Sequence, residues 1–167
     1  MWFLFACPEN CREILLDAWK KSETQENTDQ VFILTTDRVR KYEGSWHLER
    51  VNLLPGYVIC DSEAPELLKD RLLCLTGRLK INTDGAMISV EAEDQRFLER
   101  LYKGGKSFPM SRGIICNGTT CVQEGPLKGW EQNICKIDRH KRIAFLKSHE
   151  ATSEMVLKVG LEITEKT

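Results

Sequence analysis

The feature that most restricts the fold of this chain is a pair of strand-like runs joined by a short basic turn. The segment K-I-D-R-H-K-R-I-A-F-L spans residues 136–146, and its branched and aromatic residues flank the polar tetrapeptide Asp138–Lys141. Such runs around a turn-forming cluster predict a β-hairpin. Gly125 and Gly129 bracket a further turn just before it. We therefore expect this region to consist of short strands, with a basic tip on the hairpin.

Length and composition favour packed domains. The 167 residues suit one medium domain or two small ones, and 41% of them are hydrophobic, which is too many for a disordered chain. The net charge of −1 conceals an asymmetry, because acidic residues outnumber basic ones in residues 1–104 and the reverse holds in residues 105–167. The basic surplus around the hairpin favours a polyanionic partner there.

The start of the chain carries no secretion or membrane signal. Residues 1–6 are apolar but short, and they have neither the basic region nor the small-residue cleavage site of a signal peptide. No run approaches the roughly 20 apolar residues of a membrane helix. The sequence therefore predicts a cytoplasmic protein with no membrane partner, and we expect a monomer.

The seven cysteines are consistent with a reducing compartment. They include no C-x-x-C pair, so we expect free thiols buried as small hydrophobes. The closest pairs, Cys7/Cys11 and Cys116/Cys121, lack a nearby histidine set with zinc spacing, so no metal site is predicted. Asn117-Gly118-Thr119 matches a glycosylation sequon, but without secretion it is better interpreted as an Asn-Gly turn.

Helical and strand-like segments alternate before residue 104, and only short strands follow it. Strands are predicted at residues 2–6, 31–42 and 46–60, the last bent at Pro55–Gly56, and helices at residues 8–21, 63–75 and 89–103. Gly104–Ser107 is the best linker candidate. Five strands in the remaining residues suggest a small barrel, which leaves no exposed edge. The predicted domains are residues 1–104 and 108–167, with residues 105–107 as the linker.

Motifs in both predicted domains resemble the NusG family of transcription elongation factors. The start W-F-L-F-A looks like the first strand of the family's N-terminal domain, and Leu53–Ile59 is similar to its P-G-Y motif. The basic hairpin and the run V-G-L-E-I at Val159–Ile163 resemble the KOW motif and the closing strand of its barrel. The resemblance covers essentially the whole chain. It implies an α+β N-terminal domain, an antiparallel sheet with helices, followed by a small all-β KOW barrel.

Within that family the chain looks most like the specialised antiterminator paralogs of the LoaP type. The residues that carry this likeness are Arg38–Tyr42, Trp46–Glu49 and Lys136–Arg142. Cys7–Asn10 departs from the family, where a glycine-containing turn usually follows the first strand. The resemblance implies a processive antitermination factor that binds bacterial RNA polymerase at its clamp and a nascent RNA hairpin, without a cofactor. Two alternatives remain: a general NusG-type factor whose KOW domain binds proteins, and a KOW RNA-binding or ribosome-associated protein not tied to polymerase.

Three sets of candidate site residues follow from the charges and the resemblance. The residues expected to bind RNA, because arginine and lysine suit phosphates and base edges, are Lys128, Lys136, Arg139, His140, Lys141 and Arg142. The resemblance implies that polymerase binds at Leu54, Pro55, Gly56 and Tyr57. A contact with the non-template DNA strand or with a polymerase loop is expected at Arg38, Arg40, Lys41 and His47.

Each set also has a plain structural interpretation. Tyr57 could pack in the core of its own domain, and both basic sets could be solvated charged surfaces. Trp130 could stack on a base or pack on the barrel.

The sequence offers no motif that would indicate an enzyme. The chain contains no Walker A loop, no G-x-S-x-G and no H-E-x-x-H. Its three histidines and seven cysteines form no local signature of a thiol enzyme. We therefore expect a binding protein rather than an enzyme.

Overall fold

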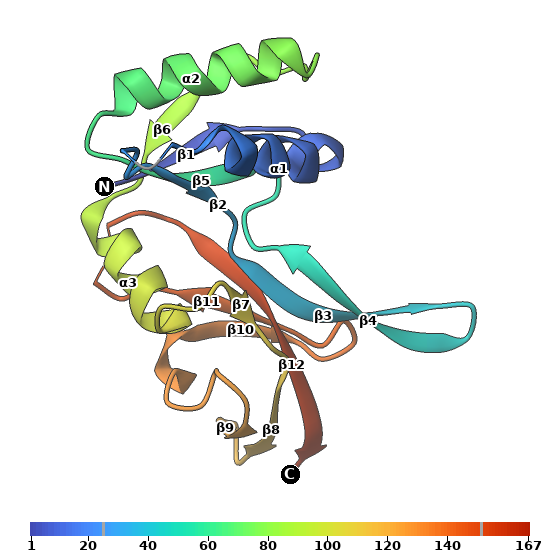
Figure 1. Cartoon of the computed structure of the whole chain (residues 1–167). Helices are drawn as coiled ribbons and strands as arrows, with labels where there is room; N and C mark the ends of the chain where they lie inside the picture. The colour runs from blue at the N-terminus through green and yellow to red at the C-terminus, as the bar shows by residue number, and fades with distance from the viewer. Residues whose placement is uncertain (25, 151) are drawn as a thin grey trace. The chain divides into compact units, whose positions relative to one another are not determined.

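The computed structural model describes residues 1–24, 26–150 and 152–167, and shows a mixed α/β protein (Figure 1). Its described part contains three sheets and three α-helices, which are α1 (Arg12–Ser22), α2 (Pro65–Arg78) and α3 (Ala92–Tyr102). Two short 3-10 helices, η1 (Glu9–Cys11) and η2 (Glu131–Asn133), complete the helical elements described. None of the described helices combines the length and the apolar character that crossing a bilayer requires.

The chain folds into two compact units, each of which is discontinuous in sequence. The first unit contains Met1–Ile33 and Leu54–Gln95, and the second contains Leu34–Leu53 and Arg96–Thr167. This division differs from the boundary predicted at residues 105–107, because residues 34–53 group with the C-terminal strands. Separate folding of residues 1–104 and 108–167 stays a prediction.

The first unit is an antiparallel sheet with two helices on one face. The strand order is β2-β5-β1-β6, formed by β1 (Trp2–Ala6), β2 (Gln30–Phe32), β5 (Tyr57–Asp61) and β6 (Met87–Ser89). Phe3 and Phe5 lie opposite Cys60 and Val58 in the β1–β5 ladder. Successive strand residues alternate between faces, so these four side chains share one. They form one buried cluster with Leu15 and Trp19 of α1 and with Leu68 and Leu72 of α2.

Local signals explain where these helices begin. Pro65 occupies the first turn of α2, where its missing N–H would be unpaired in any case. The chain enters α1 through η1 immediately after Pro8, and an ion pair of 2.6 Å joins Arg12 to Glu9 across this junction. The predicted helices at residues 8–21 and 63–75 are therefore confirmed within a few residues.

The second unit combines two sheets. One has the order β4-β3-β7 and contains β3 (Thr35–Tyr42), β4 (Ser45–Asn52) and β7 (Ser107–Phe108). The other has the order β10-β11-β12-β8-β9 and contains β8 (Ser111–Cys116), β9 (Thr119–Glu124), β10 (Ile134–Asp138), β11 (Ile143–Lys147) and β12 (Val156–Lys166). Within the described residues no ladder joins the outer strands β9 and β10, so the five strands expected from the sequence are present but the predicted closed barrel is not found.

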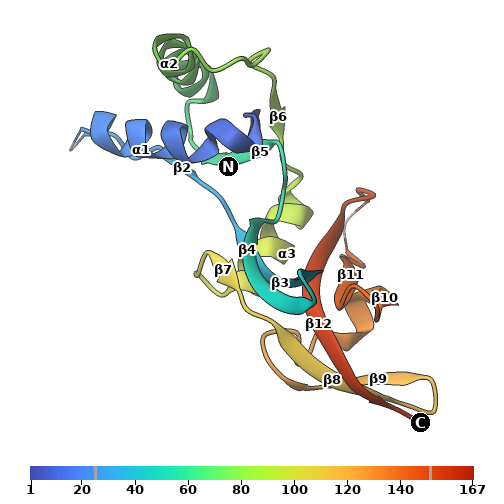
Figure 2. The same ribbon diagram turned by 90° about the vertical axis from the view of Figure 1, so that its right-hand side faces the viewer.

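Strand β3 crosses β12 at a glycine, and both views place the two strands side by side (Figure 1 and Figure 2). A Cβ atom on Gly160 would clash with the carbonyl oxygen of Asp37 and with the sulfur of Met110. Only glycine allows this approach without a shift of the backbone. The glycine of the V-G-L-E-I run thus has a structural role, which is to let the β3–β4 hairpin lie against the long strand β12.

Aromatic contacts attach the second half of α3 to the same unit. The rings of Phe97 and Trp130 meet edge to face with centroids 5.5 Å apart, and those of Tyr102 and Phe108 lie 5.4 Å apart. The Tyr102 hydroxyl donates a hydrogen bond of 2.9 Å to the carbonyl oxygen of Thr35. Burial raises the pKa of that hydroxyl, so it stays protonated and keeps this bond at physiological pH. Trp130 thus contacts α3 within this unit while staying half-buried.

Two expectations from the sequence need correction. The predicted strand 31–42 is two strands in different sheets, because β2 ends at Phe32 and β3 begins at Thr35. The cysteines are all free, but only Cys7 and Cys60 are buried. Burial raises the pKa of these two thiols to about 11 and about 12. Cys11 is half-buried against the core of the first unit, and the other four cysteines are exposed.

Candidate nucleic-acid interface

The basic turn predicted from the sequence is an exposed tip between β10 and β11. Asp138, the acidic residue of the turn, accepts a hydrogen bond of 3.0 Å from the backbone N–H of Lys141. This is an Asx-type contact that closes the turn locally. The Asp138 carboxylate is thus held by the backbone, while Arg139, His140 and Lys141 are exposed.

Arg142, the last residue of the turn, is in a different situation from its neighbours. Its backbone is left-handed, with φ at 54°, and its guanidinium lies 4.1 Å from the centre of the Trp46 ring. The same guanidinium forms an ion pair of 3.0 Å with Glu162, which is also paired with Arg112 at 3.1 Å. Arg142 therefore connects the β10–β11 hairpin to β4 and β12, and it is less available to a ligand than the tip.

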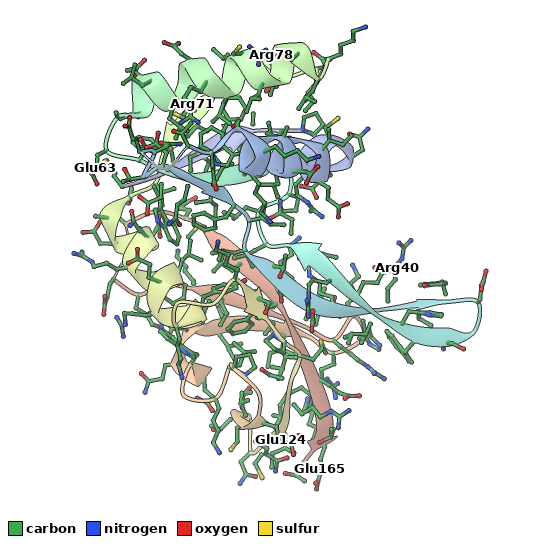
Figure 3. The ribbon with its side chains drawn as sticks, in the orientation of Figure 1. Arg40, Glu63, Arg71, Arg78, Glu124 and Glu165 are labelled. Atoms are coloured by element: carbon green, nitrogen blue, oxygen red, sulfur yellow. The ribbon has the colours of Figure 1, made fainter. Side chains whose placement is uncertain are left out.

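The β3–β4 hairpin carries the second predicted basic set. Arg38 and Arg40 share a face of β3, as the alternation of strand side chains predicts. His47 lies opposite Arg40 in the ladder, and its ring stacks on Tyr42 with centroids 3.7 Å apart. Arg40 projects from this hairpin in Figure 3.

Arg38 is the half-buried member of this set. Its guanidinium donates a hydrogen bond of 3.4 Å to the carbonyl oxygen of Lys158 on β12, and burial lowers its pKa. An arginine keeps its charge even so. A positive charge is therefore held at the place where β3 crosses β12.

The two predicted basic sets meet in one hollow of about 390 Å³ between the β3–β4 and β10–β11 hairpins, entirely within the second unit. Arg38, Arg40 and Lys41 come from one hairpin, and His140 and Lys141 from the other. The remaining lining residues are Val39, Trp46, Glu49, Val51 and Ile143. One carboxylate thus faces five groups that carry or can carry a positive charge, so the surface favours an anion.

A row of alternating basic and aromatic side chains lies next to this hollow. Phe145 of β11 is flanked in the ladders by Lys136 of β10 and Lys158 of β12. Their ammonium groups lie 5.5 and 5.8 Å from the centre of the Phe145 ring. Ile143 is two residues from Phe145, so both point to the same face of β11. The hollow and this row form one surface, which we call the hairpin surface.

Not every predicted residue belongs to the hollow. Lys128 is exposed beside the turn at Gly125–Gly129, and Arg139 and His47 flank the hollow without lining it. Sequence reasoning missed Trp46, Glu49 and Phe145 as members of the site. The signal for Trp46 was its position opposite Lys41 in a hairpin, whereas nothing local marked Phe145.

The predicted polymerase contact lies in the first unit, at the turn before β5. Gly56 has φ at 85° and donates its N–H to the Glu9 carboxylate at 2.8 Å. Pro55 is exposed and Leu54 and Tyr57 are half-buried, while the following residues of β5 turn into the core. A partner could therefore meet the turn and part of the Tyr57 ring.

Comparison with known proteins leaves the family of the chain open. No protein-family model matches the sequence, and no curated protein gives a significant match. Within the described residues, no group of three or more histidine, cysteine, aspartate or glutamate side chains is arranged to hold a metal ion.

Proposed function

We propose that this protein is a processive transcription antitermination factor of the NusG type. It would bind RNA polymerase through the first unit and a nascent RNA hairpin through the second. The observation that carries the proposal is the hairpin surface, where the basic tip at Arg139–Lys141 adjoins a second basic hairpin. The motifs that resemble the NusG family, which follow one another in the family's order, give the proposal its transcriptional context.

The charge of the surface supports an RNA ligand. Five basic groups line a hollow that has one carboxylate, and lysines flank an aromatic ring beside it. Phosphates bind such groups mainly through electrostatics and counterion release, and bases bind through stacking on aromatic rings. RNA loops and ends present both phosphates and unstacked bases.

Polymerase docking is assigned to the turn at Leu54–Tyr57. The exposed Pro55 and the half-buried Leu54 and Tyr57 suit an interface that excludes water around a small apolar centre. A factor that binds the clamp in its closed state better than in its open state shifts the polymerase toward the closed state. Pausing and termination would then be disfavoured, and no cofactor is needed because the effect comes from binding alone.

Two measurements on the full chain test the proposal. The first is co-purification with RNA polymerase, which Tyr57→Glu should abolish while circular dichroism and thermal melting stay close to wild type. The second is binding to RNA hairpins, which Arg139→Glu with Lys141→Glu should weaken by about 2–6 kcal/mol, taking about 1–3 kcal/mol for each of the two contacts.

The matched control reverses two exposed lysines outside the hairpin surface, Lys103 and Lys166, with the same change in net charge. It should leave RNA binding within about threefold of wild type. RNA binding without polymerase co-purification would favour a ribosome-associated or other RNA-binding protein. Polymerase binding without RNA binding would favour a general factor whose second unit binds proteins.

A further inference from the structure

We propose that the hollow between the two hairpins holds one unpaired nucleotide of a single-stranded RNA segment, whose base stacks on Trp46. This inference rests on the proposed function, because it names the ligand of the same surface. It goes further in assigning the hollow to a nucleobase rather than to phosphate alone.

The size and lining of the hollow suit a base. Its volume of about 390 Å³ falls within the range of about 300–1,000 Å³ that is usual for small-molecule sites. Val39, Val51 and Ile143 contribute apolar lining, and the Trp46 side chain is 40% exposed. A flat aromatic base gains from stacking and from apolar contact in such a place, whereas a bare phosphate does not.

Trp46 is also fixed in position before any ligand arrives. The guanidinium of Arg142 lies against its ring, and Glu162 holds that guanidinium in turn. A ring that is already immobilised loses less conformational entropy when a base binds. Arg142 is therefore a positioning residue for this site, and Trp46 is a residue that touches the ligand.

The cations are arranged around the hollow rather than on one side of it. Arg40 and Lys41 approach from the β3–β4 hairpin, and His140 and Lys141 from the β10–β11 turn. The phosphates on either side of an inserted nucleotide would thus each meet basic groups. An acidic peptide would satisfy the cations, but it would leave Trp46 without a stacking partner and would bring carboxylates toward Glu49.

Glu49 lies on the opposite face of β4 from Trp46, because an odd number of positions separates the two residues in the strand. The base contact is therefore assigned to Trp46 and not to Glu49.

Phe145 offers a place for the neighbouring nucleotide. It lies on the face of β11 that also carries Ile143, and Lys136 and Lys158 flank its ring. A second base could stack there while its phosphate meets a lysine. The ligand is thus expected to be a short unpaired segment such as a hairpin loop, rather than a continuous duplex.

The test measures binding of the full chain to short fluorescent oligonucleotides at fixed salt. The probes are a uridine nonamer, its deoxyribose form, and the same nonamer paired in a duplex with its adenosine complement. We expect the single-stranded RNA to bind about tenfold more tightly than the duplex, which is the lower part of the range for one stacked base. Trp46→Ala should weaken binding of every single-stranded probe by about tenfold, and Trp46→Phe should restore most of it.

The control Glu124→Gln, at an exposed position of β9 outside the hollow and labelled in Figure 3, should leave binding of every probe within about threefold of wild type. Thermal melting of each variant checks that the fold is retained. Binding of the duplex that is equal to or tighter than binding of the single strand would overturn the unpaired-nucleotide assignment, and tighter binding of the DNA probe would overturn the assignment to RNA. RNA affinity that is unchanged in Trp46→Ala would overturn the base site while leaving the proposed function intact. The absence of any RNA binding would overturn both.

Discussion

Arg142 provides the most direct test of how the two hairpins of the second unit are joined. Its guanidinium contacts the Trp46 ring at 4.1 Å and Glu162 at 3.0 Å, and its backbone has φ at 54°. The side chain therefore stabilises the unit while its backbone conformation costs free energy. Replacing it by alanine and by glycine separates these two effects.

The structure sets the expected magnitudes. The cation–π contact involves a ring that is 40% exposed and should contribute about 1 kcal/mol. The ion pair joins side chains that are 28% and 24% exposed, so solvent screens it and it should contribute about 0.5–1 kcal/mol. Glu162 keeps its ion pair with Arg112, so no unpaired carboxylate is left behind. Arg142→Ala should thus lower the free energy of unfolding by about 1.5–2 kcal/mol.

Glycine at the same position removes the same contacts but relieves the left-handed strain. Relief of about 1–2 kcal/mol is partly offset by the greater entropy of the unfolded chain, so Arg142→Gly should be more stable than Arg142→Ala by about 0.5–1 kcal/mol. This order is the reverse of what glycine and alanine give at an ordinary strand position.

Urea unfolding measures the stability of Arg142→Ala, Arg142→Gly, Trp46→Ala and the double variant Trp46→Ala, Arg142→Ala. The two single alanine variants and the double variant, compared with wild type, form a double-mutant cycle. The pair should show a coupling of about 0.5–1.5 kcal/mol, whereas independent sites add to within about 0.3–0.5 kcal/mol. Hydrogen exchange at the β3–β4 amides should rise in the same variants. Additive effects would refute the idea that Arg142 joins the hairpins, and an alanine variant as stable as the glycine variant would refute the backbone strain at this position.

Three further outcomes can be checked. Gly160→Ala should destabilise the second unit by about 1–3 kcal/mol, as an overpacked site does, and thermal melting would measure it; an unchanged melting temperature would contradict the close crossing. Burial and a raised pKa should make the thiols of Cys7 and Cys60 react slowly with iodoacetamide at neutral pH, while the exposed cysteines react within minutes, as mass spectrometry of the native protein would record. Limited proteolysis should cut first at residues 104–107 if the predicted linker is the most accessible segment.

Local patterns predicted most of the individual elements. The strand at residues 2–6, the helices over residues 8–21 and 63–75, and the hairpin around Asp138–Lys141 are all present. The turn at Asn117–Gly118 joins β8 to β9 with both residues at positive φ, as an Asn-Gly hairpin requires. In each case the signal is local. It is either a periodic spacing of apolar residues or a turn residue that determines the conformation of its immediate neighbours.

The predictions fail where contacts between residues that are far apart in the sequence determine the structure. Ile33 and Leu34 interrupt the strand predicted over residues 31–42, and both are apolar, so nothing local marks the passage from one sheet to another. The sequence identified both basic hairpins but could not show that they meet in one hollow. Nor could it show that Arg142, alone in the basic turn, is engaged by Trp46 and Glu162.

The discontinuity of the second unit has a consequence for synthesis on the ribosome. The β3–β4 hairpin is made well before β12, the strand against which it packs at Gly160. Roughly 100 residues separate the hairpin from β12. At a synthesis rate of about 5–20 residues per second, β12 therefore leaves the ribosome about 5–20 s after the hairpin. During that interval the backbone of β3 at Asp37 has no β12 to pack against, so the hairpin is less stable than in the complete protein. A C-terminal truncation that removes β12 should therefore impair a hairpin encoded about 100 residues upstream.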